Sequence, residues 1–136
     1  MCSYRVFFGL VCLTVQLSFS VCSAESVQMI ESKEAFTDFM KRNEDKLTVV
    51  NFYAAWLGPC KMIAPVFEEM AATIPGVACG KVDVDESDDV AAEYKISSMP
   101  TFIFFKYGEK VLSAFVDTMV GANADKLRGL IYRYAR

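Results

Sequence analysis

Hydrophobic residues occur along the chain in two patterns. Continuous apolar runs are typical of buried strands, and apolar residues spaced three or four apart are typical of amphipathic helices. Residues 47–53 are nearly all β-branched, aromatic or aliphatic, which predicts a central strand buried on both faces. Phe36, Phe39 and Met40 recur at i, i+3, i+4 after a candidate N-cap at Ser32, which predicts a helix with one apolar face. Further predicted strands cover residues 27–30, 77–84, 101–105 and 110–116, and further helices begin near Gly58, Val90 and Asn123.

Helix and strand breakers separate these elements. Gly58 and Pro59 start a helix, Pro65 is expected to kink it, and Pro75 with Gly76 marks its end. Residues 85–89 are read as an acidic loop, and Tyr107-Gly108 as the turn of a hairpin. The predicted order β-α-β-α-β-α-β-β-α is that of an α/β fold, a mixed sheet of about five strands with about four helices on its two faces.

Composition limits the classes of function. The chain has 136 residues, 54% of them hydrophobic, which fits one domain with a packed core. Its net charge is −3 and it has no cluster of Lys or Arg, which argues against a nucleic-acid partner. Histidine is absent and the cysteines are widely spaced, so no metal site and no cofactor is expected.

The first 24 residues differ from the rest of the chain. After Arg5 they are apolar with small polar interruptions and no acidic residue, and Cys22-Ser23-Ala24 offers a cleavage site. We interpret residues 1–24 as a signal peptide, residues 25–136 as the functional domain, and the secretory pathway, outside the cell or in the ER lumen, as its location. A retained membrane anchor and a mitochondrial presequence are the alternatives; contact with a membrane is expected only if the segment stays uncleaved.

Several short motifs in order along the chain resemble those of the thioredoxin family. They span about residues 27–136 and are Val50-Asn51-Phe52, Trp56-Leu57-Gly58-Pro59-Cys60-Lys61-Met62-Ile63-Ala64-Pro65, Lys81-Val82-Asp83-Val84-Asp85, Met99-Pro100-Thr101 and Val120-Gly121-Ala122. The resemblance implies the thioredoxin fold and a cis peptide bond before Pro100. It also implies a groove that binds extended polypeptide, lined by Trp56, Gly58, Pro59, Met99, Pro100, Gly121 and Ala122. Simple packing remains the alternative for Trp56 and Met99.

The chain departs from the family at the residues that carry its chemistry. The resemblance places the attacking cysteine at position 57, where this chain has Leu57, and the resolving cysteine at Cys60. A leucine side chain cannot ionise or form a mixed disulfide. Asn51 stands where the family commonly has a buried aspartate that serves the resolving cysteine, so Lys81, which matches the family's lysine near that carboxylate, is expected to lack this charged partner. Asn51 as an isosteric core replacement is the alternative.

Two further features are open to more than one interpretation. Cys79 is read as a small strand residue, or else as a new redox partner of Cys60 if their Cα atoms come within about 7 Å. Residues 116–119 add length relative to the family and are expected to extend the last hairpin or form a bulge. They could reshape the rim of the groove or be a neutral insertion.

Three functions fit the sequence. The first is a secreted thioredoxin-like protein that is redox-inactive or strongly attenuated and binds extended polypeptide beside Pro100. The second is an enzyme, a disulfide oxidoreductase with residual activity through Cys60. The third is a structural or signalling domain whose acidic loop at 85–89 contacts another protein.

Overall fold

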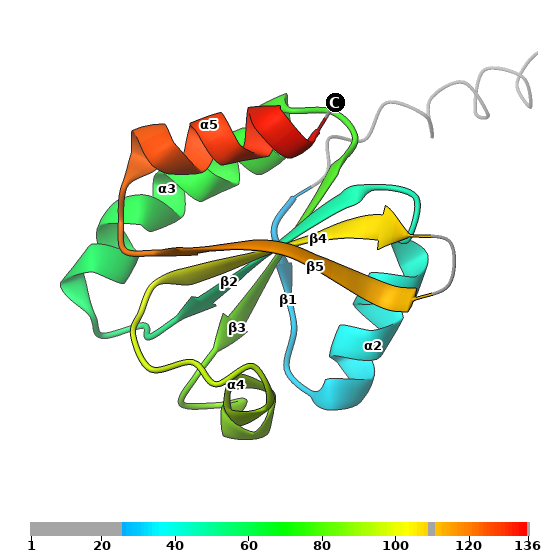
Figure 1. Cartoon of the computed structure of the whole chain (residues 1–136). Helices are drawn as coiled ribbons and strands as arrows, with labels where there is room; N and C mark the ends of the chain where they lie inside the picture. The colour runs from blue at the N-terminus through cyan, green and yellow to red at the C-terminus, as the bar shows by residue number, and fades with distance from the viewer. Residues whose placement is uncertain (1–25, 109–110, 136) are drawn as a thin grey trace, which may run out of the picture.

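The computed structural model describes residues 26–108 and 111–135, which form a five-stranded mixed sheet with helices on both faces (Figure 1). The strands are β1 (Gln28–Met29), β2 (Leu47–Tyr53), β3 (Val77–Asp83), β4 (Thr101–Gly108) and β5 (Val111–Val120). The helices are α2 (Lys33–Arg42), α3 (Gly58–Thr73), α4 (Asp88–Glu93) and α5 (Ala124–Tyr134). The predicted element order and α/β class are therefore confirmed. The predicted signal peptide at 1–24 lies outside the described residues.

The order of the strands in the sheet is β1-β3-β2-β4-β5. β2 pairs in parallel with β3 and antiparallel with β4, and β5 pairs antiparallel with β4. The carboxyl ends of β2, β3 and β5 therefore lie at the same edge of the sheet as the amino end of β4. We call this the site edge. Figure 1 shows the loops that leave β2 and β3 together on that side.

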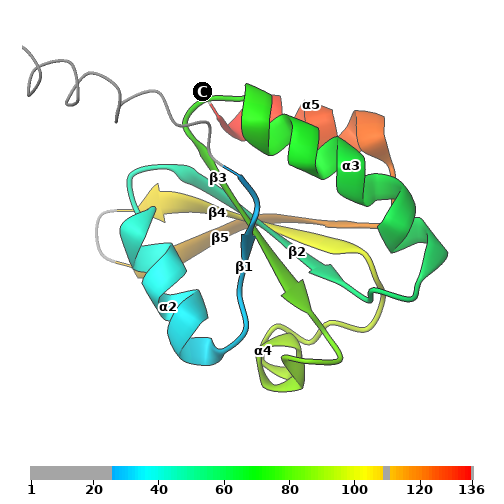
Figure 2. The same ribbon diagram turned by 180° about the vertical axis from the view of Figure 1, so that it is seen from behind.

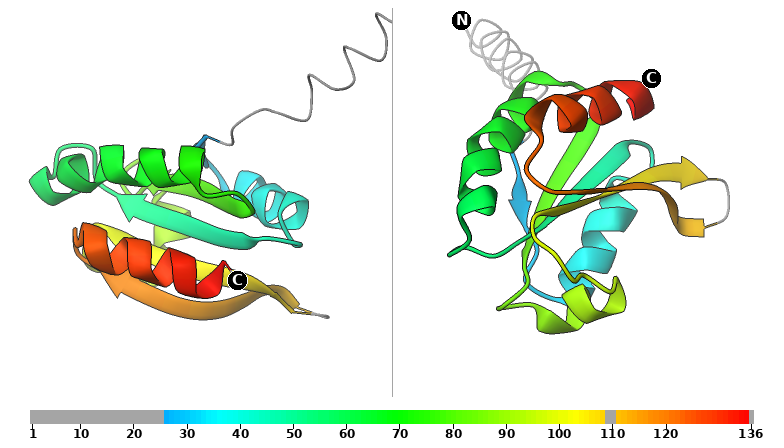
Figure 3. Two further views of the ribbon diagram at one scale, coloured as in Figure 1. Left: turned by 90° about the horizontal axis from the view of Figure 1, so that it is seen from above. Right: turned by 60° about the vertical axis from the view of Figure 1, so that its left-hand side comes forward.

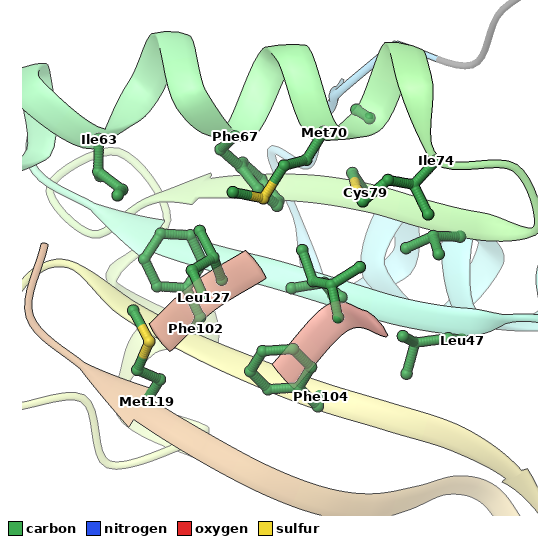
Figure 4. Packing of buried hydrophobic residues seen from close by; sticks show 14 residues of the cluster. Leu47, Ile63, Phe67, Met70, Ile74, Cys79, Phe102, Phe104, Met119 and Leu127 are labelled. Atoms are coloured by element: carbon green, nitrogen blue, oxygen red, sulfur yellow. The ribbon is translucent and has the colours of Figure 1, made fainter. Parts of the chain in front are cut away.

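Side chains alternate between two hydrophobic cores. On one face Val49, Phe102 and Phe104 pack with Phe67 of α3 and Leu127 of α5, as Figure 4 shows for the labelled members. On the other face Val50, Phe52 and Ile103 pack under α2 and α4, which Figure 2 shows on the side opposite α3 and α5. Residues 47–52 are all buried, as expected for a central strand covered on both faces.

The ends of some elements differ from the prediction. β4 continues to Gly108, so the turn predicted at Tyr107-Gly108 is wrong; the connection at 109–110 lies outside the described residues. The end of the apolar run predicts that the strand stops at residue 105. In the structure its antiparallel pairing with β5 continues beyond that residue. The acidic loop is also shorter than predicted, because α4 already begins at Asp88. Carboxylates in a first turn interact favourably with the helix dipole.

The β4–β5 ladder contains the irregularity predicted near residues 116–119. Phe104 lies opposite Asp117 while Phe105 lies opposite Phe115, so Val116 is an extra residue on β5. An extra residue in one strand of an antiparallel pair is a β-bulge, which increases local twist. Beyond the bulge the ladder resumes, and Val120 lies opposite Thr101 at the site edge.

Two helices begin with side-chain caps and one does not. Ser32 Oγ accepts a hydrogen bond from the Ala35 N–H at 3.0 Å, and Asn123 Oδ1 accepts one from the Lys126 N–H at 2.9 Å, so both predicted caps are confirmed. Leu57 occupies the N-cap of α3 and makes no capping bond, with Pro59 in the first turn. Pro65 lies inside α3, and its predicted kink stays a prediction.

The uncapped start of α3 predicts a measurable gain on substitution. Leu57→Ser supplies a hydroxyl acceptor for the first-turn N–H groups, so it should be more stable than Leu57→Ala by about 0.5–2 kcal/mol. Alanine is the reference because both variants lose the leucine side chain. Urea unfolding followed by circular dichroism measures the difference.

The exposed Met62, inside α3, provides the control. There serine should be less stable than alanine, because a hydroxyl in a helix interior competes with the backbone for hydrogen bonds. If serine gives no advantage over alanine at position 57, other groups already satisfy the first-turn donors.

Candidate functional site

The structure brings three of the predicted site segments together at the site edge. Residues 56–59 follow β2, Met99-Pro100 precedes β4, and Gly121-Ala122 follows β5. Across the sheet Phe52 lies opposite Thr101, which lies opposite Val120. The Gly121 N–H donates a hydrogen bond to the Pro100 carbonyl at 2.9 Å. Residues far apart in the chain thus become neighbours, and Figure 3 shows their loops on one side of the sheet.

The backbone around Pro100 adopts two uncommon conformations. The Met99–Pro100 peptide bond is cis, and Gly121 has φ +99°. Positive φ of this size favours glycine, because it has no Cβ to clash with the backbone. Thr101 Oγ1 donates a hydrogen bond to the Ser98 carbonyl at 2.6 Å, which ties the loop to the start of β4. Pro100 itself is buried, whereas Met99 is half-buried.

Apolar side chains are exposed at this edge. Trp56 is 65% exposed and Val120 is 59% exposed, while Leu57 and Met99 are half-buried and Ala122 is exposed. We call these five residues the apolar face. The exposure of Trp56 rules out core packing as the reason for a tryptophan at this position. Exposed aromatic and aliphatic side chains at one edge of a sheet are typical of protein interaction sites.

Asp85, which the sequence assigned to a family motif and to the acidic loop but not to the Trp56 site, holds the Trp56 ring. The indole Nε1–H donates a hydrogen bond to Asp85 Oδ2 at 2.8 Å, and Asp83 Oδ1 accepts one from the Asp85 N–H at 2.9 Å. The register that pairs Tyr53 with Asp83 explains the contact, because the loops after two adjacent parallel strands leave side by side. This strand order was the signal that could have identified Asp85.

The two motif positions that flank the first turn of α3 differ in accessibility. Leu57, at the N-cap, is half-buried, whereas Cys60 is buried and only 3% exposed. Position 57 is therefore the one nearer to the surface, and its side chain is a hydrocarbon without an ionisable group. The thiol of Cys60 lies beneath the surface that a protein substrate would contact.

Asn51 lies in the centre of the sheet, next to Lys81 on β3 and Phe102 on β4. Its side chain is 4% exposed, and its Oδ1 has no hydrogen-bond partner among the described residues. Lys81 Nζ lies 3.4 Å from Glu68 Oε1 of α3, so Lys81 has a charged partner even though it lacks the carboxylate that the family commonly has at position 51. α3 crosses the sheet face that carries Lys81 and supplies a carboxylate there, which no spacing in the sequence indicated.

Cys79 lies at the opposite end of α3 from Cys60. It belongs to the hydrophobic core and lies beside Ile74, as Figure 4 shows. Cys60 and Ile74 are separated by nearly the whole helix, about 20 Å at 1.5 Å per residue. A disulfide needs Cα atoms within about 7 Å, and none joins the two cysteines. Their pairing is therefore excluded in this fold, and Cys79 is a small core residue of β3.

The described residues form neither a metal site nor a membrane-spanning helix. Within residues 26–108 and 111–135, no three His, Cys, Asp or Glu side chains come together in a way that could hold a metal ion. Across the same described residues, no helix is long and apolar enough to cross a bilayer. The exposed apolar residues and the cis Pro100 loop make the site edge the candidate site.

Comparison with known proteins identifies the family. The thioredoxin family model matches residues 27–132. Mouse thioredoxin is 46% identical over 109 residues, which cover 80% of this chain and 99% of the mouse protein. The X-ray structure of Fasciola hepatica thioredoxin superposes with a TM-score of 0.73 at 40% identity and covers 79% of this chain and 99% of its own.

A crystal structure of Malassezia sympodialis thioredoxin agrees, with a TM-score of 0.72 at 43% identity, over 82% of this chain and 93% of the fungal chain. The family model covers most of the chain, and these relatives are matched over nearly their full length. Sequence and structure thus give the same result over the same residues. The chain belongs to the thioredoxin family of redox proteins and has the thioredoxin fold.

Proposed function

We propose that this protein is a secreted, non-catalytic member of the thioredoxin family that binds extended polypeptide on its apolar face without covalent capture. The observation that carries the proposal is the contrast at the start of α3. A leucine occupies the more accessible motif position, whereas the remaining motif cysteine, Cys60, is 3% exposed.

Thiol–disulfide exchange needs an accessible thiolate that attacks a substrate sulfur and forms a mixed disulfide. Leu57 can do neither step. Cys60 would have to attack from a buried position, and Cys79 is too far away to resolve the product. These points disfavour residual oxidoreductase activity through Cys60, which is the competing function.

The interior beneath the site supports the same proposal. An active dithiol pair benefits from a buried group that accepts a proton, and Asn51 cannot serve because its amide does not titrate near neutral pH. Lys81, which could stabilise a carboxylate at position 51, is instead paired with Glu68 at 3.4 Å. Lys81 therefore has a carboxylate partner without an acid at position 51.

The binding half of the proposal uses features that remain. Met99, Pro100 and Gly121 lie where the family resemblance places the contacts to an extended peptide. Trp56 and Leu57 add apolar surface beside them, and a buried leucine contributes about 1.5–3 kcal/mol. Such a surface can retain a polypeptide reversibly, although it cannot replace a covalent intermediate.

Secretion is proposed from residues 1–24. They carry the pattern of a signal peptide, and the family match begins only at residue 27. The partner is therefore proposed to be a polypeptide in the secretory pathway or outside the cell.

Reduction of insulin disulfides tests the loss of catalysis. In the presence of dithiothreitol the wild-type protein should not exceed the rate of Cys60→Ala, because neither has an accessible nucleophile. Leu57→Cys restores the missing thiol and should accelerate reduction above both. Turnover by the wild type that disappears in Cys60→Ala would falsify the proposal and favour the oxidoreductase function. If Leu57→Cys has no activity, Asn51 or the apolar face also prevents catalysis.

Truncation of the apolar face tests binding. Trp56→Ala and Met99→Ala should each weaken binding of a reduced, unfolded polypeptide roughly 10-fold, the scale of a central interface residue. Isothermal titration calorimetry measures the affinities. Tyr132→Ala is the matched control, because Tyr132 is 55% exposed on α5 away from the face and should leave affinity unchanged. Equal losses from all three truncations would place the binding surface elsewhere.

The buried environment of Asn51 predicts a pH-dependent cost for a carboxylate. Burial should raise the pKa of the new acid in Asn51→Asp by about 2–3 units, so folding takes up a proton. The variant should match the wild type near pH 4 and lose about 2–4 kcal/mol of stability as the pH rises to 7. Urea unfolding at several pH values measures this loss.

Asn123→Asp is the control for this substitution, because an exposed N-cap carboxylate keeps the capping oxygen. That variant should lose no stability toward neutral pH. If the stability of Asn51→Asp is equally independent of pH, water reaches position 51 and the side chain there is hydrated.

A further inference from the structure

A run of carboxylates without a neighbouring cation borders the apolar face. Between Lys81 and Lys95 the chain has no basic residue. The six acidic side chains in that interval are Asp83, Asp85, Glu86, Asp88, Asp89 and Glu93. We call the first five, on residues 83–89, the acidic border.

The acidic border lies at the site edge with the apolar face. β2 and β3 are adjacent and parallel, so the loop after Asp83 leaves the sheet beside the loop that carries Trp56. The hydrogen bond from Trp56 to Asp85 joins the two directly. Tyr53, at the end of β2, pairs with Asp83 across the sheet. Burial, followed by the negative charges of Asp83 and Glu86, raises the pKa of the Tyr53 phenol.

The carboxylates of the acidic border form no ion pair within the described residues, although Asp83, Asp85 and Asp89 each accept a hydrogen bond from an N–H group. In the part of the chain that the structure describes, the ion pairs are Lys33–Glu93, Lys81–Glu68 and Arg128–Asp125, and none involves residues 83–89. Asp85, Glu86, Asp88 and Asp89 are exposed, and Asp83 is half-buried. Five negative charges within seven residues create a local negative potential, which cationic groups on a partner would lower.

We propose that the polypeptide bound by the apolar face is basic, with lysine or arginine next to the apolar segment that packs against Trp56. The inference rests on the proposed function, since it names the chemistry of the ligand for the same face. The apolar segment would lie against Trp56 and Val120, and its cationic flank would lie over Glu86 and Asp88. Charge complementarity of this kind raises the association rate and selects among ligands of equal apolar content.

Trp56 is the only tryptophan in the chain, so its fluorescence reports binding at the face itself. Three peptides without aromatic residues share one extended apolar core and are flanked by lysines, by serines or by glutamates. The full chain is titrated with each peptide in about 20 mM and about 500 mM salt, where screening lengths differ several-fold. At low salt the lysine peptide should bind roughly 5- to 30-fold tighter than the serine peptide, and the glutamate peptide weakest. At high salt the three affinities should converge.

Two pairs of amide substitutions locate the effect. Glu86→Gln with Asp88→Asn removes two charges from the acidic border, spares the Asp85 bond to Trp56, and should abolish most of the preference for lysine. Glu44→Gln with Asp45→Asn removes two exposed charges before β2, about 20 Å from the site edge, and should leave the preference intact.

Three outcomes would overturn the inference, and they differ in whether the proposed function survives. Equal binding of the three peptides at low salt shows a face without charge selection, while the proposed function stands. A preference that persists in the Glu86→Gln, Asp88→Asn variant shows that other groups cause it. If none of the peptides changes Trp56 fluorescence or binds by calorimetry, the proposed function fails and this inference fails with it.

Discussion

The pairing of β2 with one parallel and one antiparallel neighbour is the constraint on which the site depends. A parallel β3 places the loop after Asp83 beside the loop that carries Trp56. An antiparallel β4 brings its amino end, and thus Pro100, to the same edge. If β4 ran parallel to β2, Pro100 would lie at the opposite end of the sheet, about 20 Å away. Strand direction, more than any single side chain, assembles the apolar face.

The residues that build this arrangement are separate from those that carry thioredoxin chemistry. α3 is held to the sheet by buried side chains such as Ile63 and Phe67. The Phe67 ring packs edge-on against Phe102, with the two ring centroids 5.3 Å apart. Leu57 and Asn51 belong to neither hydrophobic core, so both positions can differ from the family while the fold is retained. High identity to thioredoxins therefore identifies the scaffold, whereas activity depends on a few positions within it.

The fold could be predicted from the sequence because the order and type of its elements follow from local patterns, whereas the candidate site residues were expected from the resemblance to the thioredoxin family. The buried run at 47–53, the caps at Ser32 and Asn123, and the helix start at Gly58 each depend on neighbouring residues. What it missed depends on contacts across the fold. The Glu68–Lys81 ion pair joins a helix to a strand, and the Trp56–Asp85 bond joins two loops. Neither has a characteristic spacing, so both required the strand order.

The Trp56–Asp85 bond also bears on how a non-covalent site could function. A flexible exposed indole would lose rotational freedom on binding, whereas one already held by a 2.8 Å hydrogen bond loses less. The same bond places a carboxylate beside the ring, so apolar contact and negative charge reach a ligand together. The apolar face has five residues, few for a standard protein interface, so the proposed complex is expected to have modest affinity and a short lifetime. Under those conditions long-range attraction to the acidic border contributes more to partner choice than added apolar area, since it acts before contact is made.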